Sequence, residues 1–141
     1  MPLEWRDAMG IGHATIDADH KHLIDIINQF EASPDLAHAE KAARDLLQHA
    51  HNHFGREEQI QKDSGYPLCT LHRIEHEELL IKLKTLIRQH FIERSPTDVQ
   101  AVVTEMRDLI RDWFVGHVLY MDLKMKPYID AMTMAEALVP A

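Results

Sequence analysis

Apolar residues recur every three or four positions over four long stretches of the chain, and this spacing most limits what the chain can fold into. The stretches run over about 18–32, 35–62, 71–92 and 96–122. A 3.6-residue period is that of helices with one buried face, and no strong strand-like alternation competes with it. Short breaks separate the stretches, so consecutive helices are expected to run antiparallel. The sequence therefore predicts an all-α fold, an antiparallel up-down-up-down four-helix bundle.

The breaks hold residues that start and stop helices. Ser33 and Ser95, each followed by proline, are predicted to cap the second and fourth helices. Asp17 and Thr70 are the expected caps of the first and third helices. Gly65 is expected to end the second helix.

Composition limits the class of protein. The chain has the length of one domain, 1–141, with an N-terminal arm of about 1–17 and a C-terminal segment of about 126–141. A formal net charge of −8 argues against nucleic-acid binding. No run approaches the roughly 18 apolar residues that span a bilayer, and the N-terminus lacks the layout of a signal peptide. A single cysteine, Cys69, excludes an internal disulfide and suits a reducing cytosol, so a cytoplasmic location is predicted.

Histidine is in excess, at 11 of 141 residues. In an antiparallel bundle, the start of the first helix, the end of the second, the start of the third and the end of the fourth lie at one end. Seven histidines and carboxylates occupy those four places in turn: His20, His53, Glu57, His72, His76, His117 and Asp122. We therefore predict that these side chains converge on one point in the core. The last two are five residues apart, more than one regular turn, so a local distortion of the helix is expected between them.

This donor set indicates a metal centre and restricts the metal. Five imidazoles and two carboxylates are too many for one tetrahedral zinc ion, and calcium and magnesium prefer oxygen ligands. Imidazole together with carboxylate suits iron, among other first-row metals. If both carboxylates bridge two ions, the protein supplies about nine of the roughly twelve bonds of two six-coordinate shells. A bridging oxo or hydroxo group would supply two more, leaving one open position for a diatomic ligand.

The sequence resembles the hemerythrin family, in particular its single-domain bacterial members. The resemblance lies in "IDADHKHL", "HFGREE", "HRIEH" and "WFVGHVLYMD", which together hold all seven donors. The N-terminal "LEW" and "GIGHATID" also resemble the family's opening segment. The match runs nearly end to end, and the ordered set of motifs is far more specific than any one of them.

The resemblance implies a non-heme centre of two Fe ions, oxo- or hydroxo-bridged, that binds O2 reversibly. Three histidines would hold one iron, here His72, His76 and His117. Two would hold the other, here His20 and His53, and O2 would bind on that side. Two carboxylates, here Glu57 and Asp122, would bridge the ions.

Polar residues next to the predicted donors in the sequence have expected roles of their own. Asp19 stands where the family commonly has glutamine, a change expected to alter surface charge more than chemistry. His49 lies one turn before His53, on the same helix face, where it is a candidate to support a ligand or a water path. Glu58 is interpreted as a neighbour without a direct role, and the run 75–80, "EHEELL", as a solvated helix face.

The expected function is O2 binding for storage, delivery or sensing, without enzymatic turnover. The alternative is a di-iron enzyme, or a regulatory module with a moving C-terminal segment, that handles O2, peroxide or nitric oxide. Ferritin-like di-iron catalysts use Glu-x-x-His motifs, and this chain has none, which disfavours the enzyme. Metal storage is the weakest hypothesis. The expected partners are O2 itself and an oxygen-using enzyme or a reductase.

Overall fold

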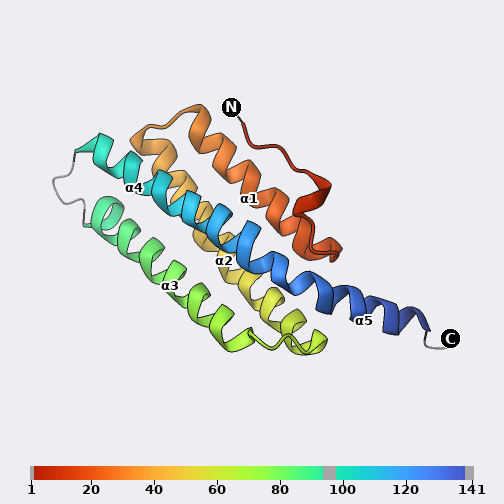
Figure 1. Cartoon of the computed structure of the whole chain (residues 1–141). Helices are drawn as coiled ribbons and strands as arrows, with labels where there is room; N and C mark the ends of the chain where they lie inside the picture. The colour runs from red at the N-terminus through yellow and green to blue at the C-terminus, as the bar shows by residue number, and fades with distance from the viewer. Residues whose placement is uncertain (1, 94–97, 139–141) are drawn as a thin grey trace.

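The computed structural model describes residues 2–93 and 98–138, and within them all regular structure is helical (Figure 1). In chain order the elements are the 3-10 turn η1 (Asp7–Met9), α1 (Ala14–Ala32), α2 (Leu36–Ser64), α3 (Cys69–Ile87), the π-helical η2 (Arg88–Ile92), α4 (Val99–Arg111), the π-helical η3 (Asp112–Met121), the 3-10 turn η4 (Asp122–Met125) and α5 (Lys126–Leu138). Figure 1 shows α1 to α4 side by side, with α5 continuing the path of α4 beyond them. The predicted four-helix bundle is confirmed. In the described part of the chain, no helix is long and apolar enough to cross a bilayer.

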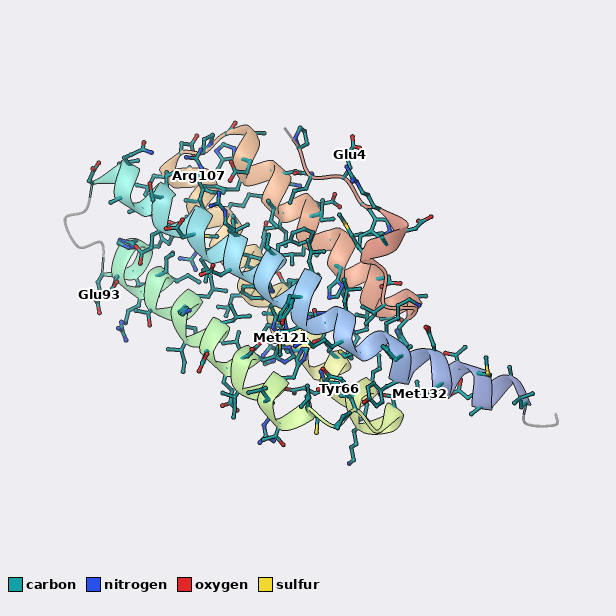
Figure 2. The ribbon with its side chains drawn as sticks, viewed as in Figure 1. Glu4, Tyr66, Glu93, Arg107, Met121 and Met132 are labelled. Carbon is teal, nitrogen blue, oxygen red and sulfur yellow. The ribbon has the colours of Figure 1, made fainter. Side chains whose placement is uncertain are left out.

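Two apolar clusters lie on either side of the seven predicted donors. The larger cluster joins the inner faces of α1 to α4 and includes Leu23, Leu46, Leu83 and Met106, all fully buried. The smaller cluster joins the N-terminal arm, the start of α1, the α2–α3 turn, η4 and α5, through Ile11, Ile16, Tyr66, Met125 and Ile129. Figure 2 shows Tyr66 near that turn and Met121 further into the bundle. The donors therefore lie in the dry middle of the fold.

The helix starts differ from those expected. Asp35, not Ser33, caps α2: its Oδ1 accepts from the His38 N–H at 2.8 Å. Ser33 instead ends α1, with its N–H bonded to the Phe30 carbonyl. Both residue types make good caps, and the one directly before the first helical residue takes the role.

The other caps show the same kind of shift. α1 begins at Ala14, so its N-cap is His13 and not Asp17, which accepts a bond from a backbone N–H of the arm instead. α3 begins at Cys69, which puts Thr70 inside the helix. Asp98 caps α4, and Ser95 lies outside the described residues.

α2 ends at Gly65, as the sequence predicts. Gly65 adopts the left-handed conformation, with φ of 69°. Its N–H bonds back to the carbonyls of Gln61 and Lys62. Glycine meets this conformation at low cost, which is why the helix stops here.

The expected distortion near the end of the fourth helix is confirmed. η3 is π-helical over ten residues, Asp112–Met121, and the Asp122 N–H bonds to the His117 carbonyl five positions back. A turn that closes on the fifth residue brings His117 and Asp122 to the same side of the helix. The helix is therefore irregular between His117 and Asp122, and this irregularity places both side chains on one side.

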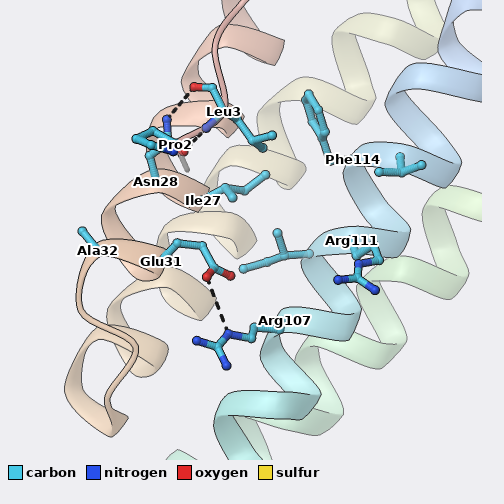
Figure 3. Close-up of a pocket in the computed structure, with 11 residues that line it drawn as sticks. Pro2, Leu3, Ile27, Asn28, Glu31, Ala32, Arg107, Arg111 and Phe114 are labelled. Carbon is cyan, nitrogen blue, oxygen red and sulfur yellow. Dashed lines mark hydrogen bonds and ion pairs between the residues drawn. The ribbon is translucent and has the colours of Figure 1, made fainter.

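The N-terminal arm packs along α1. The Leu3 N–H donates to the Asn28 Oδ1 at 2.8 Å, and the Asn28 amide donates back to the Leu3 carbonyl at 2.9 Å. Beside the arm, a groove of about 670 Å³ runs between α1 and α4 (Figure 3). An ion pair across it joins Glu31 to Arg107 at 3.6 Å. The two hydrogen bonds between Leu3 and Asn28 hold the arm against the second half of α1.

Two leucines of α3 give a matched test of the core. Leu83 is fully buried, whereas Leu71 is 49% exposed. Leu83→Ala should lower the free energy of unfolding by about 2–5 kcal/mol, because it removes buried methyl groups and leaves a cavity. Leu71→Ala should change it by no more than about 0.5 kcal/mol. Urea unfolding of the two variants measures both values, and equal losses would contradict this packing.

Candidate metal centre

The seven residues predicted to form a site come together in the structure. Each of these side chains is at most 3% exposed. They come from α1, α2, α3 and the distorted end of the α4 path, as the helix-end argument requires. The set is His20, His53, Glu57, His72, His76, His117 and Asp122.

Their donor atoms form two groups that share the carboxylates. In one group the atoms of Glu57 and Asp122 lie within 4.8 Å of those of three histidines, His72, His76 and His117. In the other group they lie within 4.8 Å of those of His20 and His53. Two cation positions that share two carboxylates are therefore available.

Glu57 directs a different oxygen at each group. Its Oε2 lies 2.9 Å from Nε2 of His53. Its Oε1 contacts Nε2 of His72 and lies 3.1 Å from Nε2 of His76. The carboxylate thus spans the space between the two groups.

Asp122 has the same relation to both groups. Its Oδ2 lies 3.0 Å from Nε2 of His20. Its Oδ1 lies 2.8 Å from Nε2 of His72 and 3.1 Å from Nε2 of His117. All five histidines therefore present Nε2 to the carboxylates.

Three further carboxylates hold the opposite ring nitrogen of three histidines. Nδ1 of His53 lies 2.9 Å from Asp19, that of His76 lies 3.4 Å from Glu58, and that of His117 lies 3.2 Å from Glu75. Such a carboxylate accepts the Nδ1–H and leaves the Nε2 lone pair free for a metal. In each case a residue of one bundle helix supports a histidine of the next bundle helix, where η3 continues the path of α4.

These contacts revise three sequence interpretations. Glu58 and Glu75 are not merely solvated, because each contacts a buried histidine. Asp19 does more than alter surface charge, since it contacts His53 and accepts two bonds from Arg56, at 3.0 and 2.7 Å. The sequence offers one clue in retrospect: all three carboxylates directly flank a predicted donor.

His49 lies on the same face of α2 as His53, as expected. It makes no hydrogen bond to any of the seven predicted metal ligands in the described structure. Its ring stacks on His53, with centroids 5.1 Å apart. Its Nε2 is buried without a hydrogen-bond partner among the described residues. Burial, followed by the neighbouring charge of His53, lowers the pKa of His49 to about 3.

Aromatic rings close the centre on the side of the larger apolar cluster. Phe54 stacks on His76 with centroids 3.7 Å apart and on Trp113 with centroids 5.5 Å apart. Phe54, Trp113 and Phe114 are all buried. These rings pack into the core beside the centre and separate it from water.

Strong electrostatic coupling links the histidines to the carboxylates. Burial opposes protonation, but the contacts with Asp122 and Glu57 outweigh it and raise the pKa of His20 and of His72 to about 9. The same opposing causes raise the pKa of His117 to about 11. Burial works against ionisation of the carboxyl groups too, yet the histidines hold the pKa of Glu57 and of Asp122 well below their usual values.

The donor chemistry fits bound cations. Nε2 of His76 and Nε2 of His117 lie 2.9 Å apart, although the Nδ1 of each contacts a carboxylate. In the metal-free protein a hydrogen on one of these Nε2 atoms can bridge the pair, and with hydrogens on Nδ1 alone both Nε2 lone pairs would be free to bind one cation. Nε2 of His20 and both oxygens of Asp122 are also buried without hydrogen-bond geometry among the described residues.

The comparisons with known proteins agree with this geometry. The family model "Hemerythrin HHE cation binding domain" matches residues 12–129. The chain is 27% identical to a bacteriohemerythrin of Stenotrophomonas maltophilia, over 82% of this chain and 74% of that one. It is 28% identical to a myohemerythrin of Sipunculus nudus, over 89% of this chain and 92% of that one. A crystal structure of a hemerythrin point mutant shares the fold, with a TM-score of 0.73 and 22% identity over 92% of this chain and 98% of that one.

The raised histidine pKa values predict how the metal-free protein responds to pH. His20 and His72 have a pKa of about 9 in the fold, against the usual histidine pKa of 6.5. Their protonation stabilises the fold fully below about pH 6.5, and this contribution is lost as the pH rises through about 9. The free energy of unfolding should therefore fall over this range by at least about 1.4 kcal/mol, the value of one pKa unit for one group.

Urea unfolding at a series of pH values measures this loss. Metal-loaded protein is the control, because metal ions would occupy the Nε2 atoms and remove the dependence on these protons. A flat curve for the metal-free protein between pH 6.5 and 9 would contradict the coupling described above.

Proposed function

The chain belongs to the hemerythrin family, and we propose that it binds O2 reversibly at a non-heme di-iron centre. His72, His76 and His117 hold one iron. His20 and His53 hold the other. Glu57 and Asp122 bridge the two ions, and the observation that carries this proposal is that each carboxylate directs one oxygen at each group of histidines.

The two iron ions would supply electrons for reversible O2 binding and an exchangeable coordination position. The number of histidines in each group would determine where that position lies. The group with His20 and His53 has one histidine fewer than the group with His72, His76 and His117. The open position therefore falls on the two-histidine side.

The surrounding residues keep the donors ordered and dry. Asp19, Glu58 and Glu75 hold three rings by their Nδ1 atoms, so each Nε2 points at the carboxylates. Phe54 and Trp113 cover one side of the centre, and Tyr66 and Met125 belong to the apolar cluster on the other side. Exclusion of water favours release of O2 over irreversible oxidation of the site.

The donor set supports binding more than turnover. A metal would bind the five histidines in their neutral form, so neutral ligands would outnumber the two carboxylates, and fewer anionic ligands stabilise the higher oxidation states of iron less well. No Glu-x-x-His motif of the ferritin-like catalysts is present in the sequence. Storage, delivery and sensing would all use this same binding step.

Removing one donor tests the ligand assignment. His117→Ala should leave fewer than two irons per chain, because it removes a nitrogen ligand and the contact that holds Asp122, a carboxylate that both donor groups share. It should also abolish an optical charge-transfer band that appears with air and disappears on deoxygenation. Iron analysis and anaerobic titration measure the two effects.

His51→Ala is the matched control, because His51 is exposed on α2 and should keep both the iron and the band. A His117→Ala protein with two irons and an unchanged spectrum would overturn the assignment. A wild-type protein that loads two irons but oxidises irreversibly in air would overturn the proposed function and leave the ligands in place.

The outer carboxylates have a separate test. Glu75→Gln keeps the shape of the side chain but removes the charge that faces Nδ1 of His117. It should weaken iron binding by about tenfold or more, in line with losses of such outer contacts in other metal sites. Competition with a chelator measures the affinity.

Glu77→Gln is the matched control for this test. Glu77 lies on the same helix, and its side chain is 64% exposed beside Arg73. Equal chelator competition curves for the two variants would show that Glu75 does not support the centre.

A further inference from the structure

An arginine of α2, Arg56, lies behind one of the donor histidines. Its guanidinium donates two bonds to Asp19 of α1, from Nε to Oδ2 at 3.0 Å and from Nη2 to Oδ1 at 2.7 Å. The same Oδ2 lies 2.9 Å from Nδ1 of His53. Arg56, Asp19 and His53 therefore form a continuous series of contacts that leads from solvent to the centre.

Burial increases along this series. The side chain of Arg56 is 42% exposed, that of Asp19 15% and that of His53 1%. A planar guanidinium that donates two parallel bonds fixes the orientation of a carboxylate, which a single contact does less well. Because the pair is partly exposed, we assign it a role in orientation and not a large share of the stability.

The other two outer carboxylates have no such support. Among the described residues, Glu58 and Glu75 contact their histidines but pair with no lysine or arginine. Their side chains are 36% and 33% exposed, so more of each carboxylate faces water. Asp19 is thus the outer carboxylate that a cation fixes in place.

The donor group with two histidines depends on this one support. Its histidines are His20 and His53. Nδ1 of His20 is buried and has no hydrogen-bond partner among the described residues. The ring of His53 is therefore the one in this group that is held from outside, and the contact that holds it is with Asp19.

We propose that Arg56 is a positioning residue for the two-histidine side of the centre: it fixes Asp19, and Asp19 orients the His53 ring so that Nε2 faces the cation position. Without Arg56, the carboxylate of Asp19 is free to turn toward solvent, and His53 loses the acceptor of its Nδ1–H. This inference rests on the proposed function, because the open coordination position falls on that side.

Titration of the metal-free full chain with Co2+, which accepts imidazole and carboxylate ligands, tests this proposal. Arg56→Ala should weaken binding of one of two Co2+ ions by about tenfold or more, as loss of outer contacts does at other metal sites. The ion held by the three-histidine group should keep its affinity, because the contacts of Arg56 and Asp19 lead to His53. Co2+ absorbance in competition with a chelator measures both affinities.

Arg44→Ala is the matched control. Arg44 also lies on α2 and pairs with a carboxylate, Glu40, at 3.4 Å, but neither residue belongs to the donor set or contacts His53. This variant should keep both Co2+ affinities. Arg56→Lys should recover part of the loss, because an ammonium group keeps the charge but not the two parallel bonds.

Nuclear magnetic resonance of the metal-free protein separates orientation from stability. In the wild type the Nδ1–H of His53 should exchange slowly with water, and Arg56→Ala should speed that exchange by about tenfold or more as the hydrogen bond opens. The Nδ1–H of His117, which faces Glu75, should be unaffected.

Two results would overturn the proposal. Equal weakening of both Co2+ ions by Arg56→Ala would assign Arg56 to general stability, and wild-type affinities in that variant would show that it has no role at the centre. Failure of the proposed function would appear elsewhere, as irreversible oxidation of the iron-loaded wild type in air, which neither Co2+ binding nor proton exchange reports.

Discussion

The fold depends on two buried carboxylates, Glu57 and Asp122, held away from solvent among five imidazoles. An ionised carboxylate buried alone is strongly unfavourable, and losing one partner of a buried pair costs about 3–5 kcal/mol. The partners here come from every helix of the bundle, so a shift of any one helix leaves charge uncompensated. Electrostatic pairing at the centre therefore sets the relative positions of the helices, and the apolar clusters on either side supply the bulk of the hydrophobic stabilisation.

The fold and the convergence of the seven donors could be predicted from the sequence, because both depend on patterns that extend over whole helices. The apolar period runs over whole helices, and the convergence of the donors needs only the direction of each helix and not its rotation. The helix starts were less predictable. Ser33 and Asp35 are equally good caps by residue type, and a shift of two residues decides between them. The chain after Asp122 also continues as a helix, where the periodic pattern had ended.

The outer carboxylates were missed for a different reason. Asp19, Glu58 and Glu75 each flank a donor in sequence but support a histidine on another segment. A residue next to an inward-facing donor points sideways, since consecutive helical residues are rotated by about 100°. Whether it then meets solvent or the neighbouring helix depends on how the two helices are rotated against each other. Sequence spacing carries no information on that rotation.

The π-helical segment Asp112–Met121 bears on attempts to redesign this protein. Engineered bundles gain stability from regular helices with uniform geometry. Here a regular turn would carry Asp122 away from His117 and remove one of the two carboxylates shared by both donor groups. A sequence optimised for an ideal four-helix bundle would therefore gain regularity and lose one of the two carboxylates that both donor groups share. In this family member, the metal chemistry and the regularity of the helix compete for the same ten residues.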